Sequence, residues 1–237
     1  MIENSTKEKI KEKGIMIKTL HTQLYPYMPK FFCYKKLFHY LGCGVSIGKI
    51  VENTCDAKFR VNELVLFWGN FHEYQFIKEH DVSLTTLLHI SSENAIPFLF
   101  YDFFVIAYNV LETCQYQDVN CLSIRLETLL ERVIGHVLED NDINVSYEKD
   151  DAEYSLIVDE KNGIGVRDNA TGEIFIIEYE TGEGIFSNPY RNEINTTIKN
   201  LDFSDWIAAH VHNENLLFYL ETYDKAKLMQ KALVMDW

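Results

Sequence analysis

Two histidines separated by one residue, His210 and His212, form the pair in this sequence that is best placed to hold a metal ion. On a β-strand, alternate side chains point to the same face, so both imidazoles could bind one divalent cation. On an α-helix they would diverge by roughly 200°. The apolar pattern from Phe203 to Val211 predicts a helix, and histidines near its C-terminal end would then stabilise the helix dipole instead.

Two further groups of residues could do chemistry, but simpler structural roles explain both. Residue types that zinc accepts gather near the N-terminus, in a spacing that matches no recognised zinc finger: Cys33, His39, Cys43 and Cys55. We interpret them as core cysteines and a surface histidine. Arg132 and His136 lie four residues apart in a predicted helix, and a surface pair at this spacing explains them without a nuclease site.

Established catalytic and cofactor motifs are missing from the sequence. It contains no GxSxG nucleophile elbow, no GxxxxGK[ST] phosphate loop, no GxGxxG after a predicted strand and no HExxH pair. Residues 42–48 contain three glycines as GxGxxxG, but they follow a predicted helix, whereas a dinucleotide cradle needs a strand, a turn and then a helix. We therefore expect no cofactor and assign no catalytic residue.

The spacing of apolar residues predicts an α+β fold with a mainly helical N-terminal and middle region. Helices are expected over about residues 62–138, an antiparallel β-meander over about 142–187, and C-terminal helices over about 190–235. Alternating apolar residues in the meander bracket two turn glycines, Gly163 and Gly172. Residues 1–60 are expected to form a basic, aromatic-rich segment, and residues 61–237 an acidic body.

The longest apolar run, from Ile96 to Leu111, indicates a buried core helix. It is shorter than the ~20 residues needed to cross a bilayer, and it contains Asp102. The five cysteines form no CxxC pair, and the sequence does not open with a signal-peptide pattern. These features predict a cytoplasmic protein without a transmembrane segment.

The net charge of −14 is divided unevenly along the chain. Residues 1–60 contain 11 basic and 5 acidic residues, whereas residues 61–237 contain 11 basic and 31 acidic residues. A strongly negative surface repels phosphate backbones and attracts basic proteins. Nucleic acid is therefore an unlikely ligand for the acidic body.

Acidic residues are densest between Glu139 and Gly184, a stretch that contains 14 acidic and 3 basic residues. Because this stretch coincides with the predicted meander, one face of the sheet should be negative. Such a face favours rapid association with a basic protein partner, such as a toxin or nuclease. The carboxylates expected to bind this partner are Asp150, Asp151, Glu153, Glu178, Glu180 and Glu183.

One partial family resemblance supports this interpretation. Residues 163–182 (GIGVRDNATGEIFIIEYETG) and residues 201–207 (LDFSDWI) resemble the second half of the SUKH superfamily. Its members show a strand pair with a glycine-containing turn, an acidic Thr-Gly turn and a closing helix that begins with a short aromatic signature. The resemblance implies an α+β domain, often an immunity protein that neutralises a toxin, and no shared catalytic residues.

The sequence thus leads to two main hypotheses of function, and binding of an anionic membrane or nucleic acid by the lysines and aromatic residues of segment 7–36 is a third alternative. The first is a cytosolic, acidic binding protein, such as an immunity or inhibitor protein, that neutralises a basic toxin or nuclease by direct contact. The alternative is an enzyme of unrecognised family, such as a metal-assisted hydrolase that uses His210 and His212 with Asp202 or Asp205 nearby. Of the two, the sequence favours a protein that is not an enzyme.

Overall fold

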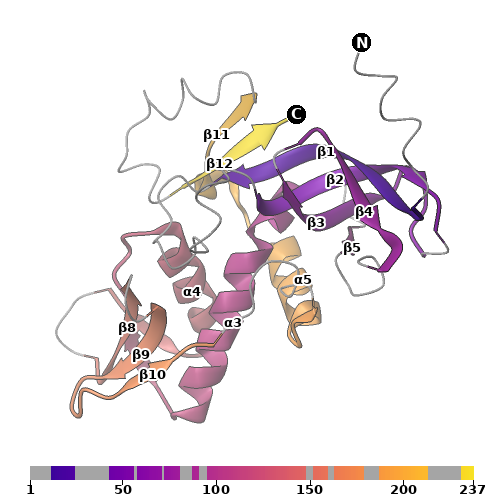
Figure 1. Cartoon of the computed structure of the whole chain (residues 1–237). Helices are drawn as coiled ribbons and strands as arrows, with labels where there is room; N and C mark the ends of the chain where they lie inside the picture. Colours follow the sequence, from indigo (N-terminus) through magenta and orange to yellow (C-terminus); the bar gives the residue numbers. More distant parts are fainter. Residues whose placement is uncertain are drawn as a thin grey trace.

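Two β-sheets, placed toward opposite ends of a long apolar helix, organise the chain (Figure 1). The structure is a computed structural model. It describes residues 12–24, 43–55, 58–70, 72–80, 87–90, 95–147, 152–159, 163–178, 187–212 and 231–237.

The first sheet joins the N-terminal strands to the C-terminal end of the chain. Its strand order is β11-β12-β1-β2-β3-β5, with β4 also paired to β1. Neighbouring strands are antiparallel except for β11 and β12, which run parallel. The strands are β1 (Gly14–Leu24), β2 (Cys43–Asn53), β3 (Leu64–Asn70), β4 (Tyr74–Lys78), β5 (Leu87–Ile90), β11 (Ile207–His212) and β12 (Ala232–Asp236).

A β-bulge in β1 changes which side chains of that strand reach the surface. Ile15, Ile17 and Thr19 are buried at alternate positions, as expected for a strand with one inward face. The pairing with β2 then gains one extra residue between Thr19 and His21. A bulge re-aims the side chains that follow it, so Thr22 is buried whereas His21 is only partly covered.

The second sheet has the order β10-β9-β8-β6-β7. β6 runs parallel to both of its neighbours, whereas β8, β9 and β10 form antiparallel pairs. The turn between β9 and β10 contains Gly172 at φ +78°, a conformation that favours glycine. The strands are β6 (Cys121–Ser123), β7 (Asn144–Ser146), β8 (Tyr154–Asp159), β9 (Gly163–Asp168) and β10 (Ile174–Ile176).

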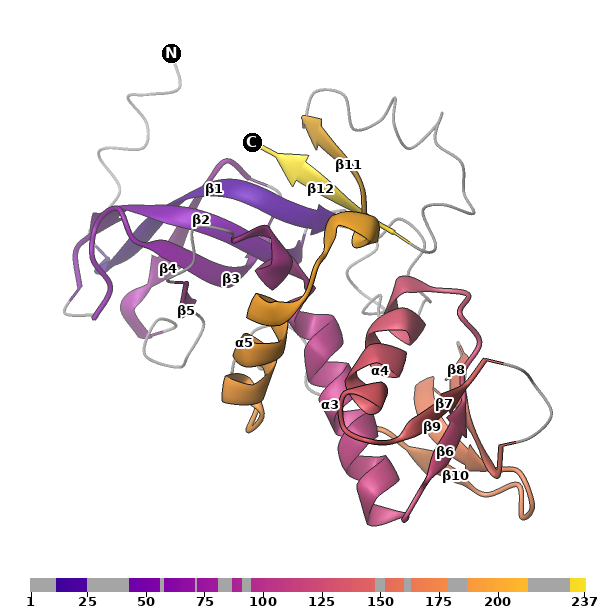
Figure 2. The same cartoon turned by 180° about the vertical axis from the view of Figure 1, so that it is seen from behind.

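Helices between the two sheets carry most of the core. Figure 2 shows α4 and α5 on either side of α3, with the second sheet beyond α4. The Tyr108 hydroxyl of α3 lies 2.8 Å from the Thr197 hydroxyl of α5 and links these two helices. The described helices are the 3₁₀ turns η1 (Ile96–Phe100) and η3 (Ser204–Trp206) and the α-helices α3 (Tyr101–Tyr116), α4 (Leu129–Glu139) and α5 (Arg191–Asn200).

The segment from Ile96 to Tyr116 is long and apolar enough to span a membrane by length and composition, but 72% of its apolar window is buried within the protein. Ten of the sixteen residues of α3 are buried, and they lie on all sides of the helix. A helix that is apolar all round is typical of a core helix. The buried helix expected from Ile96 to Leu111 is therefore confirmed.

The expectation of a mainly helical N-terminal and middle region is wrong. β3 and β4 replace the helix expected between residues 62 and 79. Val65 and Phe67 belong to one apolar cluster, whereas Leu66 belongs to the other. A strand buried on both faces has no apolar–polar alternation, so its sequence cannot be distinguished from a helix by period.

The helix expected from Phe203 to Val211 is also wrong, because this segment forms only the turn η3 and then β11. Of the expected final helix, the structure describes only the last residues, and these belong to β12. The helix expected near residues 192–200 is confirmed as α5. The helix predicted before residue 42 and residues 213–230 of the expected C-terminal helices lie outside the described residues.

The boundary expected near residue 60 falls inside the first sheet. β1 and β2 precede it, and β2 pairs with β3 immediately after it. The C-terminal strand β12 pairs with β1, so the two ends of the described chain lie in neighbouring strands. The first sheet therefore combines residues from both expected segments.

Candidate functional site

Three side chains on adjacent strands of the first sheet converge on one point. His21 lies on β1, Asp236 on β12 and His210 on β11, and these strands are neighbours. One nitrogen of each imidazole and one oxygen of the carboxylate all lie within 4.8 Å of one another. We call this group the His–Asp–His cluster.

Asp236 is the centre of the cluster. Its Oδ1 lies 2.7 Å from Nδ1 of His21 and 3.3 Å from Nδ1 of His210. The two imidazole rings meet edge to face, with centroids 6.4 Å apart. Donor atoms around a four-coordinate zinc lie roughly 3.4 Å apart, because the bonds are about 2.1 Å long. Small side-chain rotations would therefore bring all three donors onto one ion.

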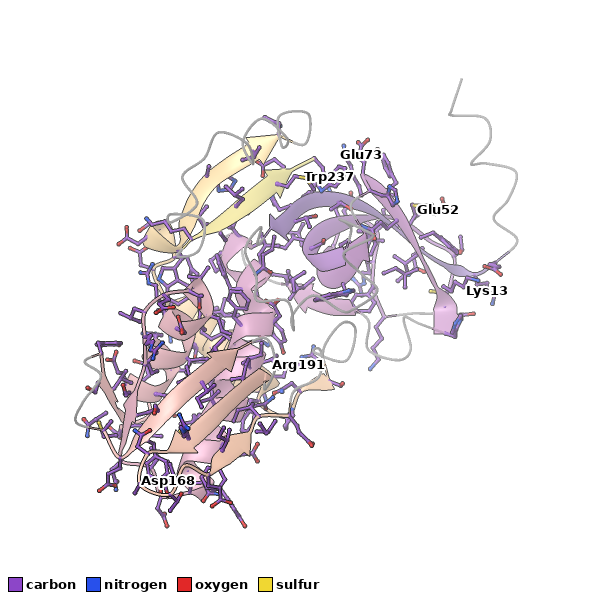
Figure 3. All side chains as sticks on the ribbon, turned by 60° about the vertical axis from the view of Figure 1, so that its left-hand side comes forward. Lys13, Glu52, Glu73, Asp168, Arg191 and Trp237 are labelled. Atoms are coloured by element: carbon purple, nitrogen blue, oxygen red, sulfur yellow. The ribbon has the colours of Figure 1, made fainter. Side chains whose placement is uncertain are left out.

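The C-terminal residue holds Asp236 in place. The Trp237 backbone N–H donates to the Leu20 carbonyl at 3.2 Å, and its indole Nε1 donates to the Thr22 hydroxyl at 3.1 Å. That hydroxyl also lies 3.1 Å from the buried Ser46 hydroxyl. Figure 3 shows Trp237 at the end of β12, beside the first sheet. These bonds tie the chain on the C-terminal side of Asp236 to β1.

The cluster remains open to solvent. The side chains of Asp236 and His21 are 23% and 30% exposed, and that of His210 is 48% exposed. Two imidazoles and one carboxylate with an open side form a donor set typical of catalytic rather than closed structural zinc sites. The arrangement could bind a metal and still leave a position for water or substrate.

The structure brings one residue of the sequence-predicted histidine pair into the cluster. His210 and His212 lie on a strand, not at a helix end, and both are exposed. His212 lies opposite Asp236 in the strand register, but His210 makes the contact with the carboxylate. Asp202 and Asp205 are not members of the cluster, and Asp202 Oδ1 instead accepts a hydrogen bond from the Ser204 backbone N–H at 2.9 Å.

The carboxylates expected to bind a basic partner are only partly described. Glu153 and Glu178 are exposed near the second sheet. The others lie outside the described residues: Asp150, Asp151, Glu180 and Glu183. In the candidate zinc group near the N-terminus, Cys33 and His39 also lie outside them. The described Cys55 donates from its thiol to the Asn53 side chain at 3.1 Å.

Arg132 and His136 both lie beside Trp206. Both approach the ring of Trp206, the first with its guanidinium carbon 5.9 Å from the ring centroid and the second edge to face at 6.3 Å. His136 also lies 3.2 Å from the Asp140 carboxylate, one helical turn away. The interpretation of the pair as structural agrees with these contacts.

A second location of functional interest lies at the carboxyl end of β6. The chain leaves β6 through α4 and pairs as β7 on one side, and it later returns as β8 on the other side. In open sheets of this kind, ligands bind where the strand order reverses, and a dinucleotide pyrophosphate sits at the helix N-terminus. The turn from Ile124 to Thr128, which leads into α4, occupies that place.

Glu131 closes this turn from within the chain. Its Oε2 accepts hydrogen bonds from the backbone N–H groups of Glu127 and Thr128 at 2.8 and 2.7 Å. The Thr128 hydroxyl in turn accepts from the Glu131 backbone N–H, which completes a capping box. Burial raises the pKa of the Glu131 carboxyl, and these hydrogen bonds act against that rise.

The fold is shared with known oxidoreductases. No family model matches the chain, and no curated protein matches it. Its structure is similar to that of 2R,3R-butanediol dehydrogenase from Bacillus subtilis, with TM-score 0.61, 8% identity, 97% of this chain and 94% of the other covered. It is also similar to the yhdH oxidoreductase from Salmonella enterica, solved with NADP, with TM-score 0.59, 12% identity and coverages of 97% and 93%.

A third similar structure is described as a zinc-binding dehydrogenase from Clostridium scindens, with TM-score 0.58, 11% identity and coverages of 96% and 91%. Likeness over nearly the whole chain to oxidoreductases overturns the interpretation as an acidic immunity or inhibitor protein. The segment expected to form the SUKH closing helix is the turn η3 followed by the strand β11. The family resemblance itself stays a prediction. The basic protein partner stays a prediction.

The β6–α4 turn does not fit the NADP found in one of these neighbours. Dinucleotide-binding turns use glycines so that the backbone can approach the pyrophosphate. Residues 124–128 (IRLET) contain none, and the Glu131 carboxylate already occupies two of the backbone donors. No cofactor is therefore assigned to this turn.

Proposed function

We propose that this chain is an enzyme that holds a divalent metal ion, zinc in the first instance, between His21, His210 and Asp236. The observation that carries the proposal is the convergence of three donor side chains from three adjacent strands within 4.8 Å. Nitrogen and carboxylate oxygen are donors that zinc accepts in catalytic sites. A bound ion of this kind acts as a Lewis acid or lowers the pKa of a bound water.

The fold of the neighbours supports an enzyme over a binding protein. The neighbour from Clostridium scindens is described as zinc-binding, and that from Bacillus subtilis is a dehydrogenase. At 8–11% identity these likenesses concern the fold, so the metal assignment rests on the donors of this chain. The proposal replaces the His210–His212 pair by the His–Asp–His cluster and includes the expected cytoplasmic location.

Each residue of the cluster has a distinct role in the proposal. Asp236 supplies the negative charge that offsets the ion, and it lies between the two imidazoles. His21 is aimed by the bulge in β1, whereas the more exposed His210 lines the side where substrate would enter. Trp237 and Thr22 position the carboxylate without touching the ion.

The test is the zinc content and activity of protein purified from zinc-supplemented cells. Wild-type protein should retain close to one zinc per chain and hydrolyse the activated ester 4-nitrophenyl acetate in a zinc-dependent way. His21→Ala and Asp236→Ala should lose both properties, whereas His212→Ala, which alters an exposed histidine outside the cluster, should keep both. Wild-type protein that retains no zinc would contradict the proposed metal, and retained zinc with no zinc-dependent hydrolysis would leave a binding site without the proposed reactivity.

A further inference from the structure

The β6–α4 turn has the topology of an anion-binding site, but the chain supplies its own anion there. β6 is flanked by two parallel strands, and α4 begins directly beyond its carboxyl end. Backbone N–H groups and the helix dipole favour a negative group at such a helix start. In this protein, the Glu131 carboxylate accepts hydrogen bonds from two of these N–H groups, those of Glu127 and Thr128.

Four backbone donors around the turn are used within the protein. The Ile124 N–H donates to the Ser146 carbonyl at 2.9 Å, which joins the turn to β7. The N–H groups of Glu127 and Thr128 donate to Glu131, and the Glu131 N–H is directed to the Thr128 hydroxyl at 3.4 Å. A phosphate could reach these four donors only by displacing partners that already satisfy them.

Charge and bulk also act against a phosphate at this turn. Glu131 is 8% exposed, so its side chain is buried at the turn and does not extend into solvent. The Glu127 carboxylate adds a second negative charge that acts on Glu131. Leu126 is 42% exposed and stands on the turn where a glycine would let a ligand approach the backbone.

We infer that the Glu131 carboxylate permanently takes the place of a cofactor phosphate at the β6–α4 turn, so this chain works without a dinucleotide there. The oxidoreductase-like fold is then retained as a scaffold, and its chemistry depends on residues outside the second sheet. Glu131 acts as a structural anion that fixes the start of α4.

Two measurements on the full chain test this inference together. The first is calorimetric titration of wild-type protein with NADPH and NADH. The second is the melting temperature of wild-type, Glu131→Ala and Glu127→Ala protein, each with and without inorganic phosphate. Glu127→Ala is the matched control, because it removes an acid from the same turn but keeps the backbone N–H that donates to Glu131.

We expect no saturable binding of either dinucleotide to wild-type protein at millimolar concentration. Glu131→Ala should lower the melting temperature by about 3–6 °C, as expected for the loss of a helix cap. Inorganic phosphate should restore part of that loss, and it should leave wild-type and Glu127→Ala protein unchanged. Saturable dinucleotide binding by wild-type protein, a Glu131→Ala variant as stable as Glu127→Ala, or equal phosphate effects in all three proteins would each overturn the inference.

Discussion

Nδ1 of His21 lies 2.7 Å from Oδ1 of Asp236, although 215 residues separate them in sequence. The contact exists because β1 and β12 pair antiparallel with these two residues directly opposite each other. Pairing of the two ends of the chain thus creates the central contact of the candidate site. Any change that loosens β12 from β1 should weaken the site before it alters the rest of the fold.

The hydrogen bond between Trp237 and Thr22 should affect metal binding without supplying a ligand. Trp237→Phe removes the indole donor but keeps an aromatic ring at the end of β12. Because second-shell contacts orient ligands, we expect zinc affinity to fall roughly tenfold. Thr22→Val removes the acceptor of the same bond, so the double variant should bind zinc about as well as either single variant. Fully additive losses in calorimetric titrations would show that the two side chains act separately.

The buried carboxyl of Asp102 should make stability depend on pH. Burial raises the pKa of Asp102 from 3.8 to about 7, and the hydrogen bond from the Phe103 N–H acts against that rise. Between these two values the folded protein keeps a proton that the unfolded chain has released. Stability should therefore fall as the pH rises from 4 to 7.

Asp102→Asn removes this titration and keeps an oxygen for the Phe103 N–H. The variant should be more stable than wild-type protein above pH 7, with a difference of at most about 4 kcal/mol, since one pKa unit corresponds to about 1.4 kcal/mol. Below pH 4 the two proteins should be nearly equal. Urea denaturation across this pH range measures the effect, and a constant difference at every pH would rule out Asp102 as its source.

Trp206 should be a major source of stability where the helices meet the first sheet. Its ring stacks on Phe104 at a centroid distance of 6.3 Å and meets Phe203 at 4.8 Å. Trp206→Ala should lower the free energy of unfolding by about 3–5 kcal/mol, because a large buried ring leaves a cavity. Tyr116→Ala is the control, since that ring is 84% exposed. Similar losses for the two variants in urea denaturation followed by circular dichroism would contradict the assigned packing.

Gly48 allows the close approach of β1 and β2 next to the bulge. A Cβ at this position would collide with the Ile17 side chain and lie 2.9 Å from the Lys18 carbonyl oxygen. Gly48→Ala should therefore destabilise the protein by about 1–3 kcal/mol. Val51→Ala, on the same strand but 41% exposed, should change stability far less. An unchanged melting temperature of Gly48→Ala would contradict this prediction. It would show that β1 shifts away from the added methyl group with little loss of stability.

Local sequence pattern was sufficient where an element is defined by its own residues. Pro97 and the apolar run after it predicted a helix, and the shortness of that run together with Asp102 favoured a buried position. The strand β3 was missed because burial on both faces removes the alternation that identifies a strand. The Thr-x-x-Glu pattern of a capping box is present in the sequence at Thr128 and Glu131, where α4 begins. The spacing of apolar residues instead predicted helices over the whole range 62–138.

The candidate site was only partly accessible from sequence. His210 stood out because a second histidine lies two residues away. β11 is the strand that the shared-face argument required, but of the two histidines only His210 joins the cluster. His21 and Asp236 carry no local signal, since neither has another candidate metal ligand within three residues in the sequence. Only long-range pairing of β1 with β12 brings them together, and sequence period does not encode that pairing.

The most direct test of the central claim is calorimetric titration of metal-free protein with zinc, comparing His210→Ala with His212→Ala. The two substitutions remove the same side chain from the same strand, and both positions are exposed. We predict one zinc site per chain with micromolar or tighter affinity in wild-type and His212→Ala protein, and its loss in His210→Ala. Equal zinc binding by the two variants, or no saturable binding by wild-type protein, would contradict the assignment of the metal to His21, His210 and Asp236.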